Sequence, residues 1–226
     1  MTAAPPAYPR IAHLVAGRGT RDDIVLGADE VSGLLAQPVV VEEKLDGANV
    51  AVWLEAGRVS CSLRSGPGAM DRAGQLGPLR AWLAENDEAM RLVLAGGSAV
   101  YAEWLLLTHS VAYDRLPAYL MVLDLWTEGS GFAGVDERNV ACREAGLATT
   151  PELWRGLPGG TNVIEELMGQ SAFGPGPMEG VVVRSLQDPS ERAKMLRAGF
   201  DRLDDDTWSK GRRPRNRLVD QEASWH

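Results

Sequence analysis

The chain has 226 residues, of which 45% are hydrophobic and 24% charged, and its formal net charge is −8. This length suits one good-sized hydrophobic core or two small ones. The acidic balance excludes a protein that holds nucleic acid by bulk positive charge alone, although a local basic groove is compatible with it. No apolar run approaches the ~20 residues of a membrane span, and residues 1–10 lack a secretory-signal pattern, so we expect a cytoplasmic protein without a membrane partner.

The cysteines and the absence of linkers bound the organisation of the chain. Cys61 and Cys142 lie too far apart to match a metal-binding or redox spacing, so we expect two free thiols in a reducing compartment. No Gly/Ser-rich or Pro-rich linker divides the sequence. We therefore predict one domain over residues 1–226, with a polar and basic tail from about 204 to 226.

The first half of the chain predicts strands followed by helices. Residues 5–36 are mixed, and a dense apolar strand is expected over 38–41. Asp46-Gly47 separates this strand from a second β-rich run, and Asp-Gly between two such runs predicts a hairpin. A further strand is expected over 58–63, and the near-helical spacing of apolar residues over 76–94 predicts one or two helices.

The second half continues with interleaved strands and helices. Strands are expected over 98–107, 119–126, 181–183 and 193–197, and helices over 135–145, ending at Gly146, and over 164–168. The order shows no strict strand–helix–strand alternation. We therefore predict an α+β fold with antiparallel sheets and helices packed outside them.

Lys44 is the first candidate for chemistry, because it stands at the end of an apolar strand beside a tight turn. A free lysine has a pKa of about 10.4, so it becomes a nucleophile at neutral pH only if burial or nearby cations lower its pKa. Arg64 and Lys194 are candidate cations if the fold brings them close. The alternative is an exposed strand-end lysine, since Lys-x-Asp-Gly alone occurs by chance in roughly a few per cent of chains of this length.

Later segments make the pattern more specific. In order, they resemble the motifs of the covalent nucleotidyltransferases, the superfamily of polynucleotide ligases and mRNA capping enzymes. The matching segments are Glu42–Gly47 for the nucleophile motif, then Ser62–Gly66, Tyr101–Trp104, Tyr119–Leu125, Glu179–Val183 and Lys194–Arg197. The resemblance extends from Tyr8 to about Leu218.

Further segments resemble the RNA ligase branch in particular. They are Tyr8–Leu14, Thr108–Pro117, and Trp208–Lys210 followed by Asn216–Leu218. The resemblance implies the ligase adenylylation-domain fold and an ATP-dependent RNA ligase that uses Mg²⁺ or Mn²⁺. Such an enzyme joins 5′-phosphate and 3′-hydroxyl ends of RNA through a covalent AMP on Lys44 and an adenylylated 5′ end.

The resemblance assigns roles to the most reactive side chains. Lys44 is the nucleophile, and Lys194 holds the α-phosphate and lowers the pKa of Lys44 by charge repulsion. Arg64 contacts phosphate or ribose, or the 5′-phosphate end of the RNA, since arginine grips phosphate with two donors. Glu103 holds the ribose hydroxyl or a metal-bound water, and Glu179 binds the metal directly or through water. Read alone, each of these acids is more often a solvated carboxylate.

The same resemblance implies a second set of nucleotide contacts. Glu42, two residues before Lys44 on a strand, faces the same way and accepts from the adenine amino group. Asp46 orients the turn and touches the ribose, while Gly47 allows an unusual φ. Val181 lines the nucleotide. Leu123 stands where the family usually has a phenylalanine that stacks on adenine, so we expect weaker nucleotide affinity.

The end of the chain carries one further departure and the tentative RNA contacts. Leu196 replaces a second lysine of the last motif, and Arg197, which follows it, points to the other face if strand alternation holds. This change favours slow adenylylation, unless another group such as Arg18 or Arg21 substitutes for the lysine. The tentative RNA-binding residues are Arg64, His109, Lys210, Arg212, Arg213 and Arg215; for the terminal basic stretch, the alternative is a solvated tail. Too few residues follow Lys194 for an OB-fold, so we expect a minimal ligase core that works with a partner protein or on short or single-stranded ends.

Other functions stay open at this stage. One is a DNA ligase or mixed nick sealer, and another is a capping-type guanylyltransferase. The last is a non-catalytic nucleic-acid-binding module with a degenerate ligase fold, which the leucines at 123 and 196 would suit. Against that module count the intact Lys44, Glu103, Glu179 and Lys194.

Overall fold

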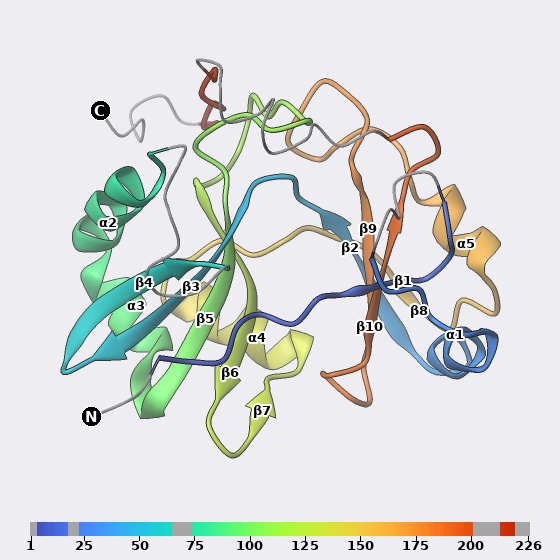
Figure 1. Ribbon diagram of the computed structural model, residues 1–226, viewed down its shortest axis with the longest axis horizontal. Coiled ribbons are helices and arrows are strands. Elements are labelled where there is room, and N and C mark those ends of the chain that lie inside the picture. Colours follow the sequence, from blue (N-terminus) through green and yellow to red (C-terminus); the bar gives the residue numbers. More distant parts are fainter. Residues whose placement is uncertain (1–3, 18–22, 65–73, 201–212, 220–226) are drawn as a thin grey trace.

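Two five-stranded sheets form the centre of the molecule (Figure 1), as seen in a computed structural model that describes residues 4–17, 23–64, 74–200 and 213–219. The first sheet has the strand order β1 (Ala12–His13), β10 (Arg192–Leu196), β9 (Gly180–Ser185), β2 (Val39–Lys44) and β8 (Glu152–Gly156). The second sheet has the order β4 (Arg58–Leu63), β3 (Ala48–Glu55), β5 (Ser98–Trp104), β6 (Leu120–Thr127) and β7 (Gly131–Phe132). All pairings in the two sheets are antiparallel except β1 with β10.

The helices lie outside the two sheets. Helices α1 (Ala28–Leu35) and α5 (Thr161–Glu166) lie beyond the first sheet, and α2 (Leu76–Glu85) and α3 (Asp87–Val93) lie beyond the second (Figure 1). Helix α4 (Val135–Glu144) packs near β6, and a short 3₁₀ turn spans Ala95–Gly97. The predicted α+β class with antiparallel sheets and outer helices is therefore confirmed. Within the described residues, no helix combines the length and the apolar character needed to cross a membrane.

Strand alternation gives the first sheet an outer and an inner face. Val39 and Val41 are fully buried in an outer core with Leu34 of α1 and Ile164 of α5. Residues 40, 42 and 44 point to the opposite, inner face because successive side chains alternate along a strand. The inner face of the first sheet is directed at the second sheet, and the ion pairs between the two sheets show this directly.

The second sheet is divided in the same way. Val50 and Val52 enter a larger core that α2 and α3 cover, whereas Ala51 and Trp53 lie on the other face with Tyr101. The chain thus buries two outer cores, and on the inner faces it buries polar side chains together with a small apolar cluster around Tyr8 and Tyr101. This arrangement places the candidate functional residues on inner faces.

A buried ion network joins the two inner faces. Asp124 of β6 binds Arg184 of β9 at 2.8 Å and Arg192 of β10 at 2.7 Å, and it accepts a short hydrogen bond from the Tyr8 hydroxyl. All four side chains are at least nine-tenths buried. Charged groups at such depth are tolerated only when they are paired, so this network fixes how the sheets face each other.

The connection after Lys44 differs from the prediction. Asp46-Gly47 does not form a hairpin, because β2 pairs with β8 and β9 while β3 pairs with β4 and β5. The turn is instead the crossover from the first sheet to the second. The hairpin lies one strand later, where Ala56 (φ 48°) and Gly57 (φ 77°) have the positive φ angles of a two-residue turn.

Other predicted elements agree with the structure within a few residues. The strand at Arg58–Leu63 is confirmed, the helical stretch over 76–94 is two helices, and Gly146 ends α4 with a φ of 72°. The sequence reading missed α1 and the short strands β1, β7 and β8. Helix α1 lies within the stretch read as mixed, and the other three strands have five residues or fewer.

The described part of the tail is not a solvated extension. Asn216 is 2% exposed, and its side chain donates to the carbonyls of Leu105 and Leu107 and accepts from the Thr108 hydroxyl and the Tyr113 amide. Residues 213–219 therefore fasten the loop that follows β5. The predicted contacts Lys210 and Arg212 lie outside the described residues.

Candidate active site

Lys44 lies at the end of β2 and forms an ion pair with Glu179, the residue directly before β9. Its Nζ is 2.7 Å from Oε1 of Glu179, and the side chains are 25% and 5% exposed. Burial favours the neutral amine, but the charges of Glu179, Glu103 and Asp46 outweigh it and raise the pKa of Lys44. The expectation of a lowered lysine pKa is therefore wrong for the chain without nucleotide.

Glu103 of β5 is the second carboxylate near this lysine. It accepts from the Gly47 amide at 3.1 Å and from Asn49 Nδ2 at 3.5 Å. Burial and the neighbouring charge of Glu179 raise the pKa of Glu103 to about 7, although Lys44 acts in the opposite direction. Two acids and one amine thus share a small buried space, and Glu103 titrates near neutral pH.

Lys194 of β10 lies on the inner face and is held by Asp23. Its Nζ is 2.6 Å from Asp23 Oδ2, and the same oxygen lies 3.2 Å from Nε2 of His13. Burial lowers the pKa of Lys194, and the charge of Lys44 adds to this effect, while Asp23 opposes it. The charge of Lys44 thus acts on Lys194 across the inner face, and the contact of Lys194 with the α-phosphate stays a prediction.

Sequence reasoning missed Asp23 and His13 as neighbours of Lys194. His13 is 2% exposed and pairs in register with Lys194, since β1 lies parallel to β10. A two-residue strand gives no periodic signal, and Asp23 stood in a stretch noted only as rich in Gly, Arg and Asp. The one usable hint was that residues 8–14 belong to a family-like segment.

Asp46 and Gly47 shape the crossover between the sheets. Asp46 is 5% exposed, and its Oδ2 accepts from the amides of Ser110 and Val111 at 2.5 and 2.7 Å. Gly47 is not among the described glycines with a positive φ. A Cβ there would lie 2.6 Å from both Leu105 Cδ2 and the Trp104 carbonyl oxygen, so close packing, and not an unusual φ, requires glycine.

Glu42 is engaged by two guanidinium groups. It is 1% exposed, its Oε2 lies 2.6 Å from Arg184 Nε, and Arg138 of α4 makes bonds to both carboxylate oxygens. Burial acts against the charged form, yet the two arginines outweigh it and lower the pKa of Glu42. In this structure the carboxylate serves the ion network, contrary to the expectation that it meets the adenine amino group.

The two predicted apolar contacts have different positions. Val181 is fully buried in the outer core of the first sheet, so its expected contact with nucleotide is wrong; Val182 is the inner-face residue and pairs with Lys194. Leu123 lies on the inner side of the second sheet, packed against the Tyr8 and Tyr101 cluster. Its carbonyl accepts a hydrogen bond from Arg138 at 2.6 Å.

The residue that departs from the last motif is also placed. Leu196 is partly buried against the larger core, and Arg197 lies with its guanidinium 5.3 Å from the centre of the Phe200 ring. Leu196 lies on the same face of β10 as Lys194. Arg197 follows the end of the strand, and its amide donates to the Glu179 carbonyl at 3.0 Å. Arg18 and Arg21, the predicted substitutes for the missing lysine, lie outside the described residues.

The tentative RNA contacts form a separate group. Arg64 is exposed directly after β4, and its amide donates to the Asn49 carbonyl at 2.9 Å. Arg213 is half-buried and Arg215 exposed, and Arg215 pairs with Leu107, close to His109. The structure thus brings Arg215 and His109 onto neighbouring segments.

The acids near Lys44 also bear on metal binding. Among the described residues, no three His, Cys, Asp or Glu side chains converge as a metal cluster. Magnesium is usually held by one or two carboxylates together with waters and substrate phosphates, not by an all-protein cage. Glu103 and Glu179 fit this requirement for one or two protein carboxylates.

The sheet pair and its inner lysine define the class of fold. It is a nucleotidyltransferase-type fold shared with RNA ligase structures from Naegleria gruberi. The sequence model described as RNA ligase matches residues 37–196, and the chain belongs to this family. The match includes Lys44, Glu103, Glu179 and Lys194. No curated protein matches the chain.

The solved structures share the fold at low sequence identity. A mutant of the Naegleria gruberi RNA ligase with ATP and manganese has a TM-score of 0.54 and 14% identity, with 75% of this chain and 52% of that chain covered. An apo mutant of the same ligase has a TM-score of 0.55 and 14% identity, with 87% of this chain and 59% of that chain covered. The form with pyrophosphate has a TM-score of 0.54 and 14% identity, with 85% of this chain and 61% of that chain covered. This chain thus spans about half to three fifths of these ligases.

Proposed function

We propose that the protein is an ATP-dependent RNA ligase that acts through a covalent AMP on Lys44. The Lys44 nitrogen attacks the α-phosphorus of ATP, a P–N bond forms, and pyrophosphate leaves. The 5′-phosphate of an RNA end then attacks the same phosphorus, which frees Lys44 and leaves an adenylylated 5′ end. A 3′-hydroxyl finally displaces AMP and forms the phosphodiester. The observation that carries this proposal is the pairing of Lys44 with Glu179, beside Glu103 and Lys194, in a chain of the RNA ligase family.

The first step requires Lys44 to lose a proton. In the free chain, Glu179 at 2.7 Å and Glu103 keep the amine charged. A divalent cation held by these two carboxylates would draw their charge away from Lys44 and neutralise phosphate oxygens. The raised pKa of Glu103, about 7, fits a carboxylate that gains stability when a cation binds. The ATP and manganese of the Naegleria gruberi structures support this choice of cofactors.

Lys194 is suited to hold the α-phosphate. It lies on the inner face two strands away from Lys44, and burial lowers the pKa of its amine. Asp23 is its ion-pair partner, and a phosphate oxygen that displaced Asp23 would keep the ammonium paired. Leu123 offers the base an apolar surface on the opposite sheet. Val182, not Val181, is the inner-face valine available on the first sheet.

The RNA ends have fewer described candidates. Arg64 is exposed at the end of β4 and suits the 5′-phosphate end through its two-donor fork. His109 and Arg215 lie on neighbouring segments that Asn216 holds together. We propose RNA with 5′-phosphate and 3′-hydroxyl ends as the substrate, gripped with the help of a partner protein in the cytoplasm.

The decisive experiment is nucleotide transfer to the protein. The purified chain is incubated with Mg²⁺ or Mn²⁺ and α-³²P-labelled ATP or GTP, denatured, and examined for label. Lys44→Ala is compared with Arg143→Ala, an exposed change on α4 that removes the same charge. We expect label from ATP alone, lost only in Lys44→Ala. No label after pyrophosphate has stripped any bound AMP would leave a non-catalytic binding module.

A second assay separates the substrates. Nicked and single-stranded RNA and DNA carrying 5′-phosphate and 3′-hydroxyl ends compete for the labelled protein. Sealing of RNA in preference to DNA supports the proposal, while equal or better sealing of DNA would replace it by a DNA ligase or mixed nick sealer. Label from GTP alone would indicate a capping-type activity.

A further inference from the structure

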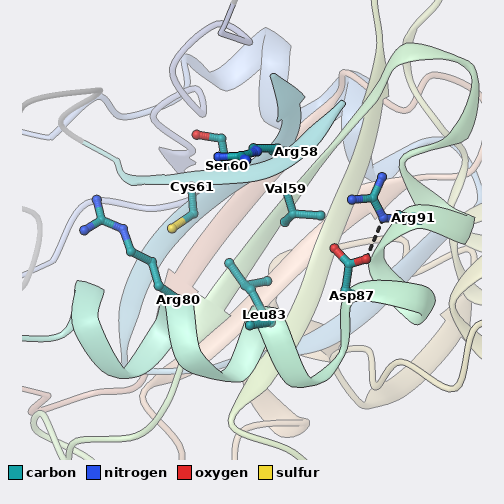
Figure 2. Close-up of a pocket in the computed structure, with 9 residues that line it drawn as sticks. Arg58, Val59, Ser60, Cys61, Arg80, Leu83, Asp87 and Arg91 are labelled. Atoms are coloured by element: carbon teal, nitrogen blue, oxygen red, sulfur yellow. Dashed lines mark hydrogen bonds and ion pairs between the residues drawn. The ribbon is translucent and has the colours of Figure 1, made fainter. Parts of the chain in front are cut away.

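A pocket on the outer side of the second sheet is separate from the candidate active site. It has a volume of about 300 Å³ and lies between the edge strand β4 and helices α2 and α3 (Figure 2). Its lining residues are Arg58, Val59, Ser60, Cys61, Arg80, Leu83, Ala84, Asp87 and Arg91. No residue assigned above to nucleotide or metal lines it.

The charge of this pocket departs from that of the whole chain. Its lining carries the guanidinium groups of Arg58, Arg80 and Arg91 against the single carboxylate of Asp87, whereas the chain has a net charge of −8. In Figure 2, Arg80 and Arg91 rise from the helices on either side of Leu83, and Arg58 comes from the strand opposite. A local positive surface on an acidic protein favours an anionic ligand.

One wall of the pocket is held in place by its own contacts. Arg91 pairs with Asp87 one helical turn earlier at 2.6 Å, and it donates to the Gly57 carbonyl in the β3–β4 hairpin at 3.0 Å. These bonds fasten α3 to the edge strand. Arg91 thus builds the wall, and the exposed Arg58 and Arg80 supply the positive charge that a ligand would meet.

The position of the pocket indicates which anion. Strand β4 runs from Arg58 directly to Arg64, the residue proposed to contact the 5′-phosphate end. At ~3.3 Å per residue, this path is about 20 Å long, which spans several nucleotides. The lining has no aromatic ring for base stacking. Guanidinium groups beside apolar side chains suit the phosphates of a nucleic-acid backbone, whatever its base sequence.

We propose that this pocket is a contact site for the sugar–phosphate backbone of the RNA, several nucleotides from the ends being sealed. The proposal rests on the proposed function for the identity of the ligand. It predicts contacts that strengthen RNA binding without reading sequence and without taking part in the transfer of AMP to Lys44.

The thiol of Cys61 reports on the pocket in the unaltered protein. Cys61 is part-exposed in the lining, and the other cysteine, Cys142, is fully buried. Burial raises the pKa of Cys61 although Arg80 acts against it, so alkylation is followed at mildly alkaline pH. We expect saturating RNA to slow alkylation of Cys61 several-fold, and ATP alone to leave it unchanged. Protection by ATP but not by RNA would overturn the proposal.

The matching variants remove one phosphate contact each. Arg58→Ala and Arg80→Ala are expected to weaken RNA binding roughly three- to ten-fold and to reduce the salt dependence of log K by about 1. Arg143→Ala, an exposed arginine on α4, is the control of equal charge change. Both pocket variants should still form Lys44–AMP at the rate of the unaltered chain, which separates this test from the proposed function. If RNA leaves Cys61 alkylation unchanged, or the pocket variants bind RNA as Arg143→Ala does, the proposal is wrong.

Discussion

Lys44 carries its charge in the nucleotide-free chain because the surrounding carboxylates outweigh the effect of burial on its pKa. A lysine held in this way attacks only after those charges are withdrawn. The carboxylates that are proposed to hold the cation therefore also set the resting state of the nucleophile. This coupling has a measurable consequence in the absence of nucleotide.

Neutralising Glu179 should lower the pKa of Lys44. In Glu179→Gln the ammonium loses its partner at 2.7 Å while the burial that favours the neutral amine remains. At a fixed alkaline pH the reactive fraction of Lys44 then rises, and the pH profile of its acetylation, followed by mass spectrometry, moves to lower pH. Glu166→Gln, an exposed change on α5, should leave the profile in place. A shift to higher pH would contradict this account of the ion pair.

Asp23 competes with phosphate for Lys194. Its carboxylate is 2.6 Å from the Lys194 amine and 36% exposed, so a partly solvated ion pair of about 0.5–1 kcal/mol opposes nucleotide binding. Asp23→Asn should therefore lower KM for ATP in the adenylylation step about two- to five-fold, with kcat little changed. Asp29→Asn, an exposed change on α1, is the matched control. A raised KM would show that Asp23 orients Lys194 instead of competing for it.

At the scale of elements, the crossover between β2 and β3 carries the candidate site. It connects Lys44 in the first sheet to Asn49 in the second, and Asn49 lies opposite Glu103 in the β3–β5 pairing. Within the crossover, the Gly47 amide donates a hydrogen bond to the Glu103 carboxylate. The crossover can follow this path because residue 47 has no side chain. Its geometry is therefore a property of packing as much as of turn chemistry.

Gly47→Ala should destabilise the chain. The added Cβ would meet the Trp104 carbonyl oxygen and Leu105 at 2.6 Å, and relieving such a clash costs about 1–3 kcal/mol. Chemical denaturation measures the loss. Gly33→Ala is the control, since a Cβ in that helix meets nothing within 4 Å and should stabilise by about 0.4–1 kcal/mol. Equal changes in the free energy of unfolding would show that the crossover accommodates a Cβ at residue 47 without loss of stability.

Periodic patterns and local turn residues predicted most elements but not their pairing. The apolar alternation in the segment that became β4 and the glycine after α4 have local causes, so the sequence sufficed. Whether Asp-Gly turns a hairpin or leads into another sheet depends on partners far along the chain, such as β9 for β2. For the same reason Val181, not Val182, was assigned to the nucleotide.

The candidate site shows the same division. The motifs name Lys44, Glu103, Glu179 and Lys194 because they lie in order in the sequence. The structure pairs Lys44 with Glu179, and the charges of the four groups act on one another's pKa values; their roles stay predictions. The partners Asp23, Arg138 and Arg184 could not be predicted, since each meets its acid or base across a long loop of chain. The ion pairs of Glu42 could not be predicted either, because its burial and both guanidinium groups become visible only in three dimensions.

At the scale of the whole molecule, buried charged side chains link the two sheets beside the small apolar cluster of Tyr8 and Tyr101. Arg138 illustrates the arrangement, because it reaches from α4 to Glu42 on the first sheet and to the Leu123 carbonyl on the second. Arg184 makes a second link, from Glu42 to Asp124. The separation of the sheets, and thus the distance from Lys44 and Lys194 to Leu123, depends on these bonds.

Removing Arg138 should therefore loosen the molecule and its site together. In Arg138→Met, the 1%-exposed Glu42 keeps only Arg184, and breaking a buried pair costs about 3–5 kcal/mol. Arg155→Met removes an arginine that is 35% exposed and pairs with Asp136 and Glu152, so it should cost only about 0–1 kcal/mol. The denaturant midpoints of the two variants measure this difference. Transfer of AMP to Lys44 should fall in Arg138→Met and not in Arg155→Met.

The double variant Glu42→Leu/Arg138→Met tests whether the loss comes from an unpaired charge or from the missing link. Apolar side chains in place of both partners remove the uncompensated carboxylate, so stability should recover by about 1–4 kcal/mol relative to Arg138→Met. The bond to the Leu123 carbonyl stays absent, and AMP transfer should remain slow. If AMP transfer recovers with stability, the network only keeps the chain folded; if it does not, the guanidinium of Arg138 sets the distance between the sheets at which Lys44 meets the nucleotide.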